Sequence, residues 1–276
     1  MIQINDLSFG YSARSQLFDN LTLNLEPGNI YGLLGKNGAG KTTLIKQMAG
    51  LLFPDKGKLS VMGYAPEKRV PEMLKDIFMI PEEFYLPSVS VKQFIEINGA
   101  FYPGFDPEQL SRYLKELEIE GHTMINHMSF GQKKKLIIAF SLAVNTKILI
   151  LDEPTNGLDI PSKSQFRKII SQSMNDDRLI LISTHQVRDL SNLINYIIIL
   201  EGGKIIFEKD IFSIAQKIAF KRIKSMDEEE VLYKEETLGG YNAMVKNKDG
   251  VESEIDLELL FNGIISNLAF IKEKIE

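Results

Sequence analysis

The segment GLLGKNGAGKTT, residues 32–43, constrains the fold of this chain more than any other feature. It fits the pattern G-x-x-x-x-G-K-[ST] through Gly35, Gly40, Lys41 and Thr42. An apolar run, IYGLL, leads into it, and an apolar stretch with helical spacing, TTLIKQMAGLL, leads out of it. A glycine-rich connection from a buried strand into a helix is typical of α/β folds and predicts that the loop lies at one edge of a sheet.

The loop has the chemistry of a phosphate-binding site. Glycines allow backbone N–H groups to curl around phosphates, and the N-terminus of the following helix adds a positive potential. We expect Lys41 to reach the β- and γ-phosphates and Thr42 to hold Mg²⁺. The expected cradle consists of Gly35, Asn37, Gly38, Ala39, Gly40, Lys41, Thr42 and Thr43. The segment therefore predicts a nucleoside triphosphate site.

Short apolar runs alternate with helical patterns through about residue 200. Strands are predicted at 2–9, 21–25, 30–34, 58–61, 77–80, 147–151, 178–183, 196–200 and 204–207. Helices are predicted near 41–52, 91–101, 107–118, 131–145, 161–174 and 186–194. Several strands are continuous isoleucine and leucine runs, which is typical of parallel strands buried on both faces. The alternation predicts an α/β P-loop NTPase core with a mixed sheet covered by helices on both sides.

Two stretches depart from this alternation. Residues 84–130 have a helical pattern without a convincing strand, and we interpret them as a helical insert in a domain that spans 1–208. The second stretch begins after about residue 209, where the sequence is charge-rich and carries turn signals at Gly239-Gly240 and Asp249-Gly250. These features predict a small α+β appendage over 209–276.

The bulk composition excludes several classes of protein. The net charge of −5 argues against a general nucleic-acid or lipid-coating surface, so we expect no nucleic acid partner. The absence of cysteine excludes disulfides and thiolate metal sites. No apolar run approaches the roughly 18 residues of a membrane span, and the N-terminus lacks the features of a signal peptide. We expect the chain to be neither secreted nor membrane-spanning.

A pair of acids supports the phosphate site. The apolar strand in KILILDEP ends in Asp152 and Glu153. Asp152, at the strand tip, is placed to hold the metal, as the second acidic element of such sites does. Glu153 is expected to face differently because side chains alternate along a strand. A carboxylate beside the metal can accept a proton from attacking water, which predicts Glu153 as the general base.

These motifs together resemble the nucleotide-binding subunit of an ATP-binding cassette (ABC) transporter, over residues 1 to about 208. The motifs occur in the order found in that family, and MSFGQ, residues 128–132, is similar to its signature Leu-Ser-Gly-Gly-Gln. The resemblance implies that Tyr11 stacks on adenine and that His185, in STHQ, is the switch histidine that contacts the γ-phosphate and acts in catalysis. It implies further nucleotide contacts by Ser129, Gly131, Gln132 and, in NGLD, Asp159.

In this family two subunits meet head to tail, and the signature helix of one points at the nucleotide bound by the other. The resemblance therefore implies a homodimer or heterodimer. It also accounts for three consecutive lysines, 133–135, near a positive helix end, because a triphosphate offsets the repulsion. Lys135 lies where the family often has arginine, and Lys133 and Lys134 are expected to extend into solvent. The alternative is that one of the three lysines contacts the phosphate directly.

Three residues depart from the family pattern. Met128 replaces the usual leucine, an apolar swap of similar size with little consequence. Phe130 replaces the first signature glycine, so its ring must turn aside from the phosphate. Glu82 stands where the family has glutamine after a strand. A carboxylate is a stronger Mg²⁺ ligand than an amide oxygen, so we expect Glu82 to sense the metal. The alternative is that Glu82 is an exposed loop acid.

The resemblance implies an Mg²⁺-dependent ATPase that drives a transporter with separate transmembrane permease subunits. The expected location is cytoplasmic, peripheral on the inner face of the cell membrane. The motif PTNGLD and the small appendage resemble exporters more than importers. The alternative is a soluble ABC ATPase of the Fe–S assembly or another non-transport type.

Overall fold

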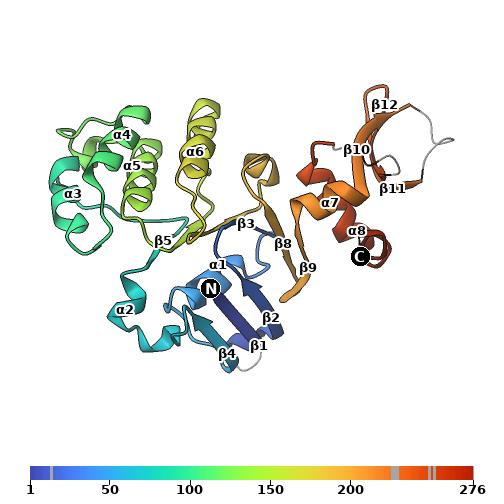
Figure 1. Ribbon diagram of the computed structural model, residues 1–276, viewed down its shortest axis with the longest axis horizontal. Coiled ribbons are helices and arrows are strands. Elements are labelled where there is room, and N and C mark those ends of the chain that lie inside the picture. Colours follow the sequence, from blue (N-terminus) through green and yellow to red (C-terminus); the bar gives the residue numbers. More distant parts are fainter. Residues whose placement is uncertain (13–14, 225–229, 248–249, 251–252, 276) are drawn as a thin grey trace.

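A computed structural model of the protein describes residues 1–12, 15–224, 230–247, 250 and 253–275 (Figure 1). The strands are β1 (Ile2–Ser12), β2 (Ser15–Leu25), β3 (Asn29–Leu34), β4 (Lys56–Val61), β5 (Ile77–Ile80), β6 (Ile148–Asp152), β7 (Leu179–Thr184), β8 (Tyr196–Glu201), β9 (Lys204–Asp210), β10 (Ile218–Ile223), β11 (Val231–Thr237) and β12 (Gly240–Lys246). The α-helices are α1 (Lys41–Met48), α2 (Pro71–Leu74), α3 (Val91–Gly99), α4 (Pro107–Glu116), α5 (Phe130–Ala143), α6 (Ile160–Gln172), α7 (Ile211–Lys217) and α8 (Leu257–Ile275). Short 3₁₀ turns are η1 (Pro66–Lys68), η2 (Ile125–His127) and η3 (Val187–Leu190).

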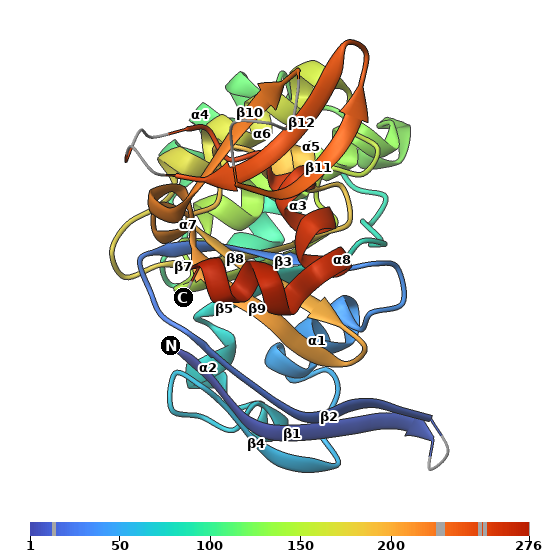
Figure 2. The ribbon, with the colours of Figure 1, turned by 90° about the vertical axis from the view of Figure 1, so that its right-hand side faces the viewer.

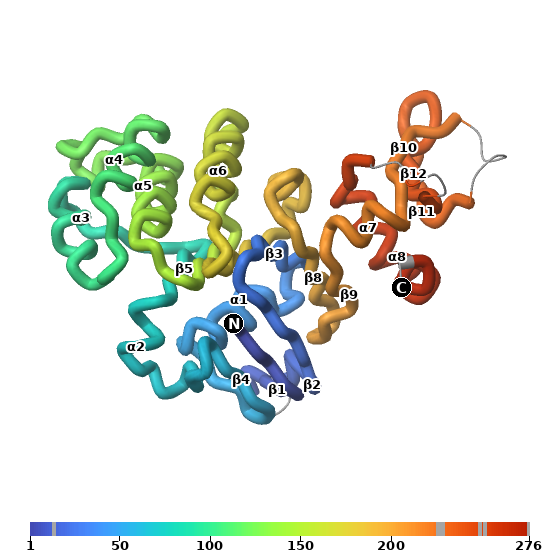
Figure 3. Tube along the Cα trace, in the orientation of Figure 1, coloured from blue at the N-terminus to red at the C-terminus, as the bar shows by residue number. Residues whose placement is uncertain are grey.

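The central sheet has the strand order β5-β6-β7-β3-β8-β9. Its first five strands are parallel, and β9 runs antiparallel to β8. A separate antiparallel sheet, β2-β1-β4, lies below it in Figures 1 and 3. The predicted α/β fold with a mixed sheet is confirmed.

The central sheet is buried on both faces, as its isoleucine and leucine runs predicted. Alternate residues of β6 enter different cores, with Leu149 and Leu151 on one face and Ile148 and Ile150 on the other. Helix α1 and the β2-β1-β4 sheet cover one face, while α5, α6 and the helical region cover the other. The side chains alternate because successive residues of a strand point to opposite faces.

The strand register brings distant segments together at one edge of the sheet. Leu34, the last residue of β3, pairs with Thr184 of β7, and Asp152 of β6 pairs with Ser183. The carboxyl ends of β3, β6 and β7 therefore meet, and in open α/β sheets this is the edge where ligands bind.

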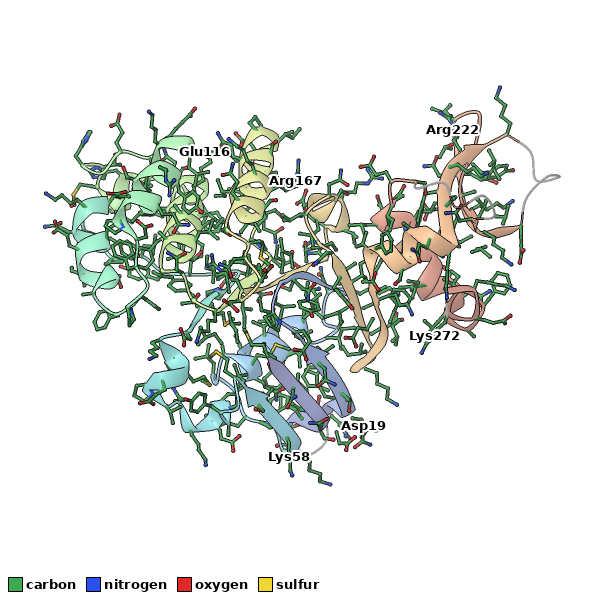
Figure 4. The ribbon with its side chains drawn as sticks, viewed as in Figure 1. Asp19, Lys58, Glu116, Arg167, Arg222 and Lys272 are labelled. Atoms are coloured by element: carbon green, nitrogen blue, oxygen red, sulfur yellow. The ribbon has the colours of Figure 1, made fainter. Side chains whose placement is uncertain are left out.

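Residues 84–130 contain α3, α4 and η2 and no strand, and all of these residues are described. This region packs beside α6. Lys168 of α6 forms an ion pair with Glu116 of α4 at 2.5 Å, and Gln165 donates to the Glu116 carbonyl at 3.2 Å. Figure 4 shows Glu116 and Arg167 on the two neighbouring helices.

The C-terminal region is an α+β unit, which faces the viewer in Figure 2. Its antiparallel sheet has the order β10-β12-β11. Leu238 and Gly239 form the turn between β11 and β12, and Gly239 and the first residue of β12, Gly240, both have positive φ. Of the second turn signal, Asp249 lies outside the described residues. The unit contacts the segment around η3, since Arg188 pairs with Glu258 and the Asn192 amide donates to Glu254 at 2.7 Å.

Two helix predictions differ from the structure. Residues 186–194 form only the four-residue η3, because the Thr184 hydroxyl accepts from the Gln186 N–H and Asn192 adopts φ 60°. Such side-chain bonds divert the backbone from a helix. The helix predicted over 41–52 ends at Met48, because Gly50 takes a left-handed φ of 67° that closes its C-terminus.

Candidate functional site

The glycine loop runs from the end of β3 into α1. Gly38 and Gly40 have φ values of 80° and 103°, which favour glycine. Gly35 passes close to β8, where an added Cβ would lie 2.5 Å from the Leu200 carbonyl oxygen. Helix α1 has no side-chain hydrogen bond at its N-cap, Gly40, so its first N–H groups are available to a ligand. The loop is an anion cradle in its backbone geometry.

Lys41 points back into this loop and is 7% exposed. Its Nζ donates to the Gly35 carbonyl at 2.7 Å and lies 3.9 Å from Glu153 Oε1. Burial lowers the pKa of Lys41, while the nearby charges of Glu153, Asp152 and Glu82 oppose the shift. The carbonyls hold the ammonium at the mouth of the cradle, where a phosphate could replace them as its partner.

Asp152 lies beside the cradle and is 1% exposed. The Thr42 hydroxyl donates to Asp152 Oδ2 at 2.7 Å, and Ser183 donates to Oδ1. The two expected metal holders, 110 positions apart in the chain, are thus in direct contact. Among the described residues, no cluster of three or more Asp, Glu or His is arranged to bind a metal. A hydroxyl and one carboxylate still suit Mg²⁺, which usually keeps water and phosphate oxygens in its shell.

Glu153 is held by the end of β7. Its Oε2 accepts from the Thr184 hydroxyl at 3.0 Å, and its Oε1 accepts from the His185 N–H at 3.0 Å and lies 2.8 Å from His185 Nδ1. The two catalytic candidates therefore touch. Glu153 diverges from Asp152 for a reason other than strand alternation, because β6 ends at Asp152 and Glu153 adopts a left-handed φ of 47°. Such a backbone costs roughly 1–3 kcal/mol and concentrates at functional sites.

Glu82 lies in the loop after β5, at the same edge of the sheet. It is exposed, and its Oε1 accepts from Asn156 Nδ2 at 3.0 Å. Asn156 Oδ1 in turn accepts from Gln186 Nε2 at 3.1 Å. The carboxylate is thus occupied by Asn156, and metal sensing by Glu82 stays a prediction.

The signature segment begins α5. Ser129 is the N-cap, and its Oγ accepts a hydrogen bond from the Gln132 N–H at 3.2 Å. The Gln132 Oε1 in turn accepts from the Ser129 N–H at 2.9 Å. Within the described residues, Ser129, Gly131 and Gln132 form no hydrogen bond to the glycine loop of their own chain. Asp159 likewise caps α6, and hydrogen bonds from Ser162 lower its pKa.

The Phe130 ring packs against the loop after β5, and its turning aside from a bound phosphate stays a prediction. It stacks on Phe84 with ring centroids 5.7 Å apart and stays half exposed. An added Cβ on Gly157 would lie 2.9 Å from the Phe130 ring, so the ring also packs against the turn after β6.

The sequence model of the family described as "ABC transporter" matches residues 18–156, half of the chain. That match covers the cradle, the signature segment and the acidic pair. The chain belongs to the ABC transporter family.

Relatives of this ABC transporter subunit are ATP-binding proteins. The bacitracin transport ATP-binding protein BcrA of Bacillus licheniformis is 32% identical over 75% of this chain and 69% of its own length. The SkfA peptide export ATP-binding protein SkfE of Bacillus subtilis is 30% identical over 74% of this chain and 87% of its own. These names favour transport over the soluble alternative.

Solved structures have the same fold. The ATP-binding subunit of an ABC transporter superposes with a TM-score of 0.70 at 24% identity, covering 78% of this chain and 91% of the other. The cbiO1 subunit of Clostridium perfringens, part of the cbiONQ complex, gives 0.65 at 26% identity, covering 76% and 88%. This ABC transporter subunit binds ATP and is an ATPase. In the described residues, no helix combines the length and apolarity needed to cross a bilayer.

Sequence reasoning missed one residue of this site. Lys134 was expected to extend into solvent, and that expectation is wrong, because Lys134 is 0% exposed. Its Nζ donates to the carbonyls of Glu153 at 2.8 Å and Asn156 at 3.0 Å. Within a run of three lysines, the pattern carries no signal that singles out the middle one.

Tyr11 lies on β1 with 65% of its surface exposed, so a base could stack on its ring. Its hydroxyl bonds Thr43 Oγ1 at 2.8 Å, a contact that the sequence did not predict. If the ring holds adenine, Tyr11→Ala should weaken ATP binding by about 1–3 kcal/mol. Tyr11→Phe should change ATP affinity little, because the hydroxyl bonds protein rather than base. Calorimetric titration with ATP measures both, and an equal loss in the two variants would assign the effect to the hydroxyl.

Proposed function

We propose that this subunit is the motor of an ABC exporter, in which Mg²⁺-ATP hydrolysis in a pair of subunits drives separate transmembrane subunits. The observation that carries the proposal is the meeting of three strand ends, which places the Thr42–Asp152 pair beside the Glu153–His185 pair. Export is supported by the peptide export relative, and transport more generally by the bacitracin transport relative.

In this proposal Thr42 and Asp152 would hold Mg²⁺, and Glu82 would add a carboxylate to the site. The ion, when bound, neutralises charge on the β- and γ-phosphates. Lys41 and the N–H groups of the cradle hold the same phosphates from the protein side. These groups keep the triphosphate in place without taking part in proton transfer.

Glu153 accepts the proton of the attacking water. Its side chain is held by Thr184 and His185, so the carboxylate is oriented before substrate arrives. His185 is 36% exposed at its side chain and can turn one ring nitrogen toward the γ-phosphate. Positioned general bases contribute typically 10²–10⁴-fold in rate.

The second subunit completes each site. Ser129 and Gly131, at the exposed N-terminus of α5, contact the nucleotide bound by the partner, with Gln132 and Asp159 beside them. The helix N-terminus and the Ser129 O–H suit a phosphate oxygen. The partner is a second nucleotide-binding subunit, identical or related.

The ATPase domain, 1–208, docks on the transmembrane subunit through the region around 82–105, at the start of its helical insert, 84–130, at the inner face of the membrane. Large apolar side chains are exposed there, namely Tyr85 at 88%, Ile97 at 59% and Phe101 at 73%. Exposed aromatic and aliphatic groups in one region are typical of protein contacts. The appendage, 209–276, begins with the last residues of β9 and carries no assigned contact to the membrane.

The docking proposal predicts that Tyr85→Ser combined with Phe101→Ser reduces co-purification with a co-expressed transmembrane subunit by about tenfold or more, as the loss of two aromatic anchors would. Phe212→Ser, at a residue of α7 that is 61% exposed, is the control and should co-purify normally. ATP affinity of each variant checks its folding. Equal recovery of both variants with the membrane protein would argue against docking through the insert.

A further inference from the structure

Lys134 is a buried cation outside the established nucleotide motifs. It lies in the second turn of α5, 0% exposed, whereas its neighbours Lys133 and Lys135 are half-buried. Buried lysines are rare because the ammonium loses its hydration, and they persist where other groups replace the water. Here the replacements are two backbone carbonyls, of Glu153 at 2.8 Å and of Asn156 at 3.0 Å.

These two carbonyls belong to the turn that carries the proposed general base. The Asn156 N–H donates to the Glu153 carbonyl at 3.3 Å, so Lys134 contacts both ends of one tight turn. Glu153 has a left-handed φ of 47° in that turn, a backbone that requires support from its surroundings. Thr184 and His185 hold its carboxylate, and Lys134 holds its carbonyl.

The surroundings of Lys134 suit a charged side chain. Burial lowers the pKa of Lys134, while the negative charges of Glu82, Glu153 and Asp152 oppose the shift. The Phe130 ring lies 5.4 Å from Nζ, on the side of the signature segment, and adds a cation–π contact. The ammonium thus has two carbonyls, one aromatic face and three nearby carboxylates.

We propose that Lys134 is a positioning residue for ATP hydrolysis, which holds the 153–156 turn so that the Glu153 carboxylate stays aimed at the attacking water. The proposal rests on the proposed role of Glu153 as the base. In this proposal Lys134 acts on the rate through Glu153, whose carbonyl it contacts.

The first measurement compares Lys134→Met with Lys133→Met. Methionine fills similar space without a donor, and Lys133 is the control on the same helix. We expect Lys134→Met to lower kcat by about 10–100-fold, as small misplacements of a catalytic group do, with the KM for ATP changed by less than about threefold. Lys133→Met should leave kcat unchanged. A normal kcat in folded Lys134→Met would overturn the proposal.

The second measurement is a double-mutant cycle with Glu153→Gln, using single-turnover hydrolysis. Because residues that act as a unit are not additive, Lys134→Met should slow Glu153→Gln further by less than about threefold. If the two losses in rate multiply, Lys134 acts independently of Glu153. That result would overturn the positioning role of Lys134 and leave the role of Glu153 as the base intact. A normal rate in Glu153→Gln would instead remove the role of Glu153, and the Lys134 proposal with it.

Lys134→Gln serves as the second variant. Its amide keeps N–H donors with a shorter reach, so kcat should recover part of the loss seen with methionine. If Lys134→Met does not fold, Lys134→Gln takes its place in the cycle with the same expectations. A loss of kcat in Lys134→Gln that multiplies with the loss in Glu153→Gln would overturn the proposal.

Discussion

Replacing Glu153 with glutamine is expected to slow ATP hydrolysis by about 10²–10⁴-fold while ATP binding is retained. Glutamine has nearly the same shape, so Thr184 and His185 keep a partner, but an amide oxygen does not take the proton of attacking water. The substitution also removes a negative charge that lies 3.9 Å from Lys41 Nζ, which favours the bound triphosphate. Single-turnover hydrolysis and calorimetric ATP titration measure the two effects separately.

The same variant should persist as an ATP-bound dimer on size-exclusion chromatography with Mg²⁺-ATP. Adding Ser129→Arg should return it to a monomer, because the bulky cation blocks the N-terminus of α5 from the partner's nucleotide. Glu72→Gln, at an exposed acid of α2, is the matched control and should hydrolyse ATP normally. Normal hydrolysis by Glu153→Gln would rule out its role as the base. A monomeric Glu153→Gln would mean that pairing requires the membrane subunits, with Phe130 in the signature as the structural reason.

Replacing Lys41 with alanine is expected to weaken ATP binding by about 2–5 kcal/mol, roughly 30-fold or more in Kd. The cradle would keep its N–H groups but lose the ammonium that the Gly35 carbonyl and Glu153 hold at its mouth. The charges of Glu153 and Asp152 would then face the phosphates without a compensating cation. Calorimetric titration with ATP gives the change directly.

Lys46→Ala is the control for this experiment. Lys46 lies in the last turn of the same helix, α1, so the variant has the same charge change at the end away from the cradle. Its ATP affinity should stay within about threefold of the parent. An exposed charge at a helix terminus typically changes the energy of that terminus by only about 0.3–1 kcal/mol, and this terminus is the one away from the cradle. If Lys41→Ala binds ATP as tightly as the parent, the assignment of the glycine loop to the nucleotide site is wrong.

The order of helices and strands could be predicted from hydrophobic periodicity, because each element depends mainly on the pattern of its own residues. The isoleucine and leucine runs of β6 and β7 indicated strands buried on both faces, and both proved central. Prediction was wrong for 186–194, where the bond from the Gln186 N–H to Thr184 and the positive φ of Asn192 override an apolar pattern. In the appendage, alternating charge left the elements undefined, since weak periodicity does not say which strands pair.

The sequence by itself determined the chemistry of the site. Two contiguous segments carry this chemistry: the glycine loop with its lysine, and the strand that ends in two acids. They specify an anion cradle and a metal-binding acid because the geometry within each segment is set by its own backbone. Only the tertiary structure decided the partners. Glu82 meets Asn156 across 74 positions, Glu153 meets His185 across 32, and Lys134 lies under the 153–156 turn. Such contacts follow from strand register and helix packing, which place side chains of separate segments within hydrogen-bond distance.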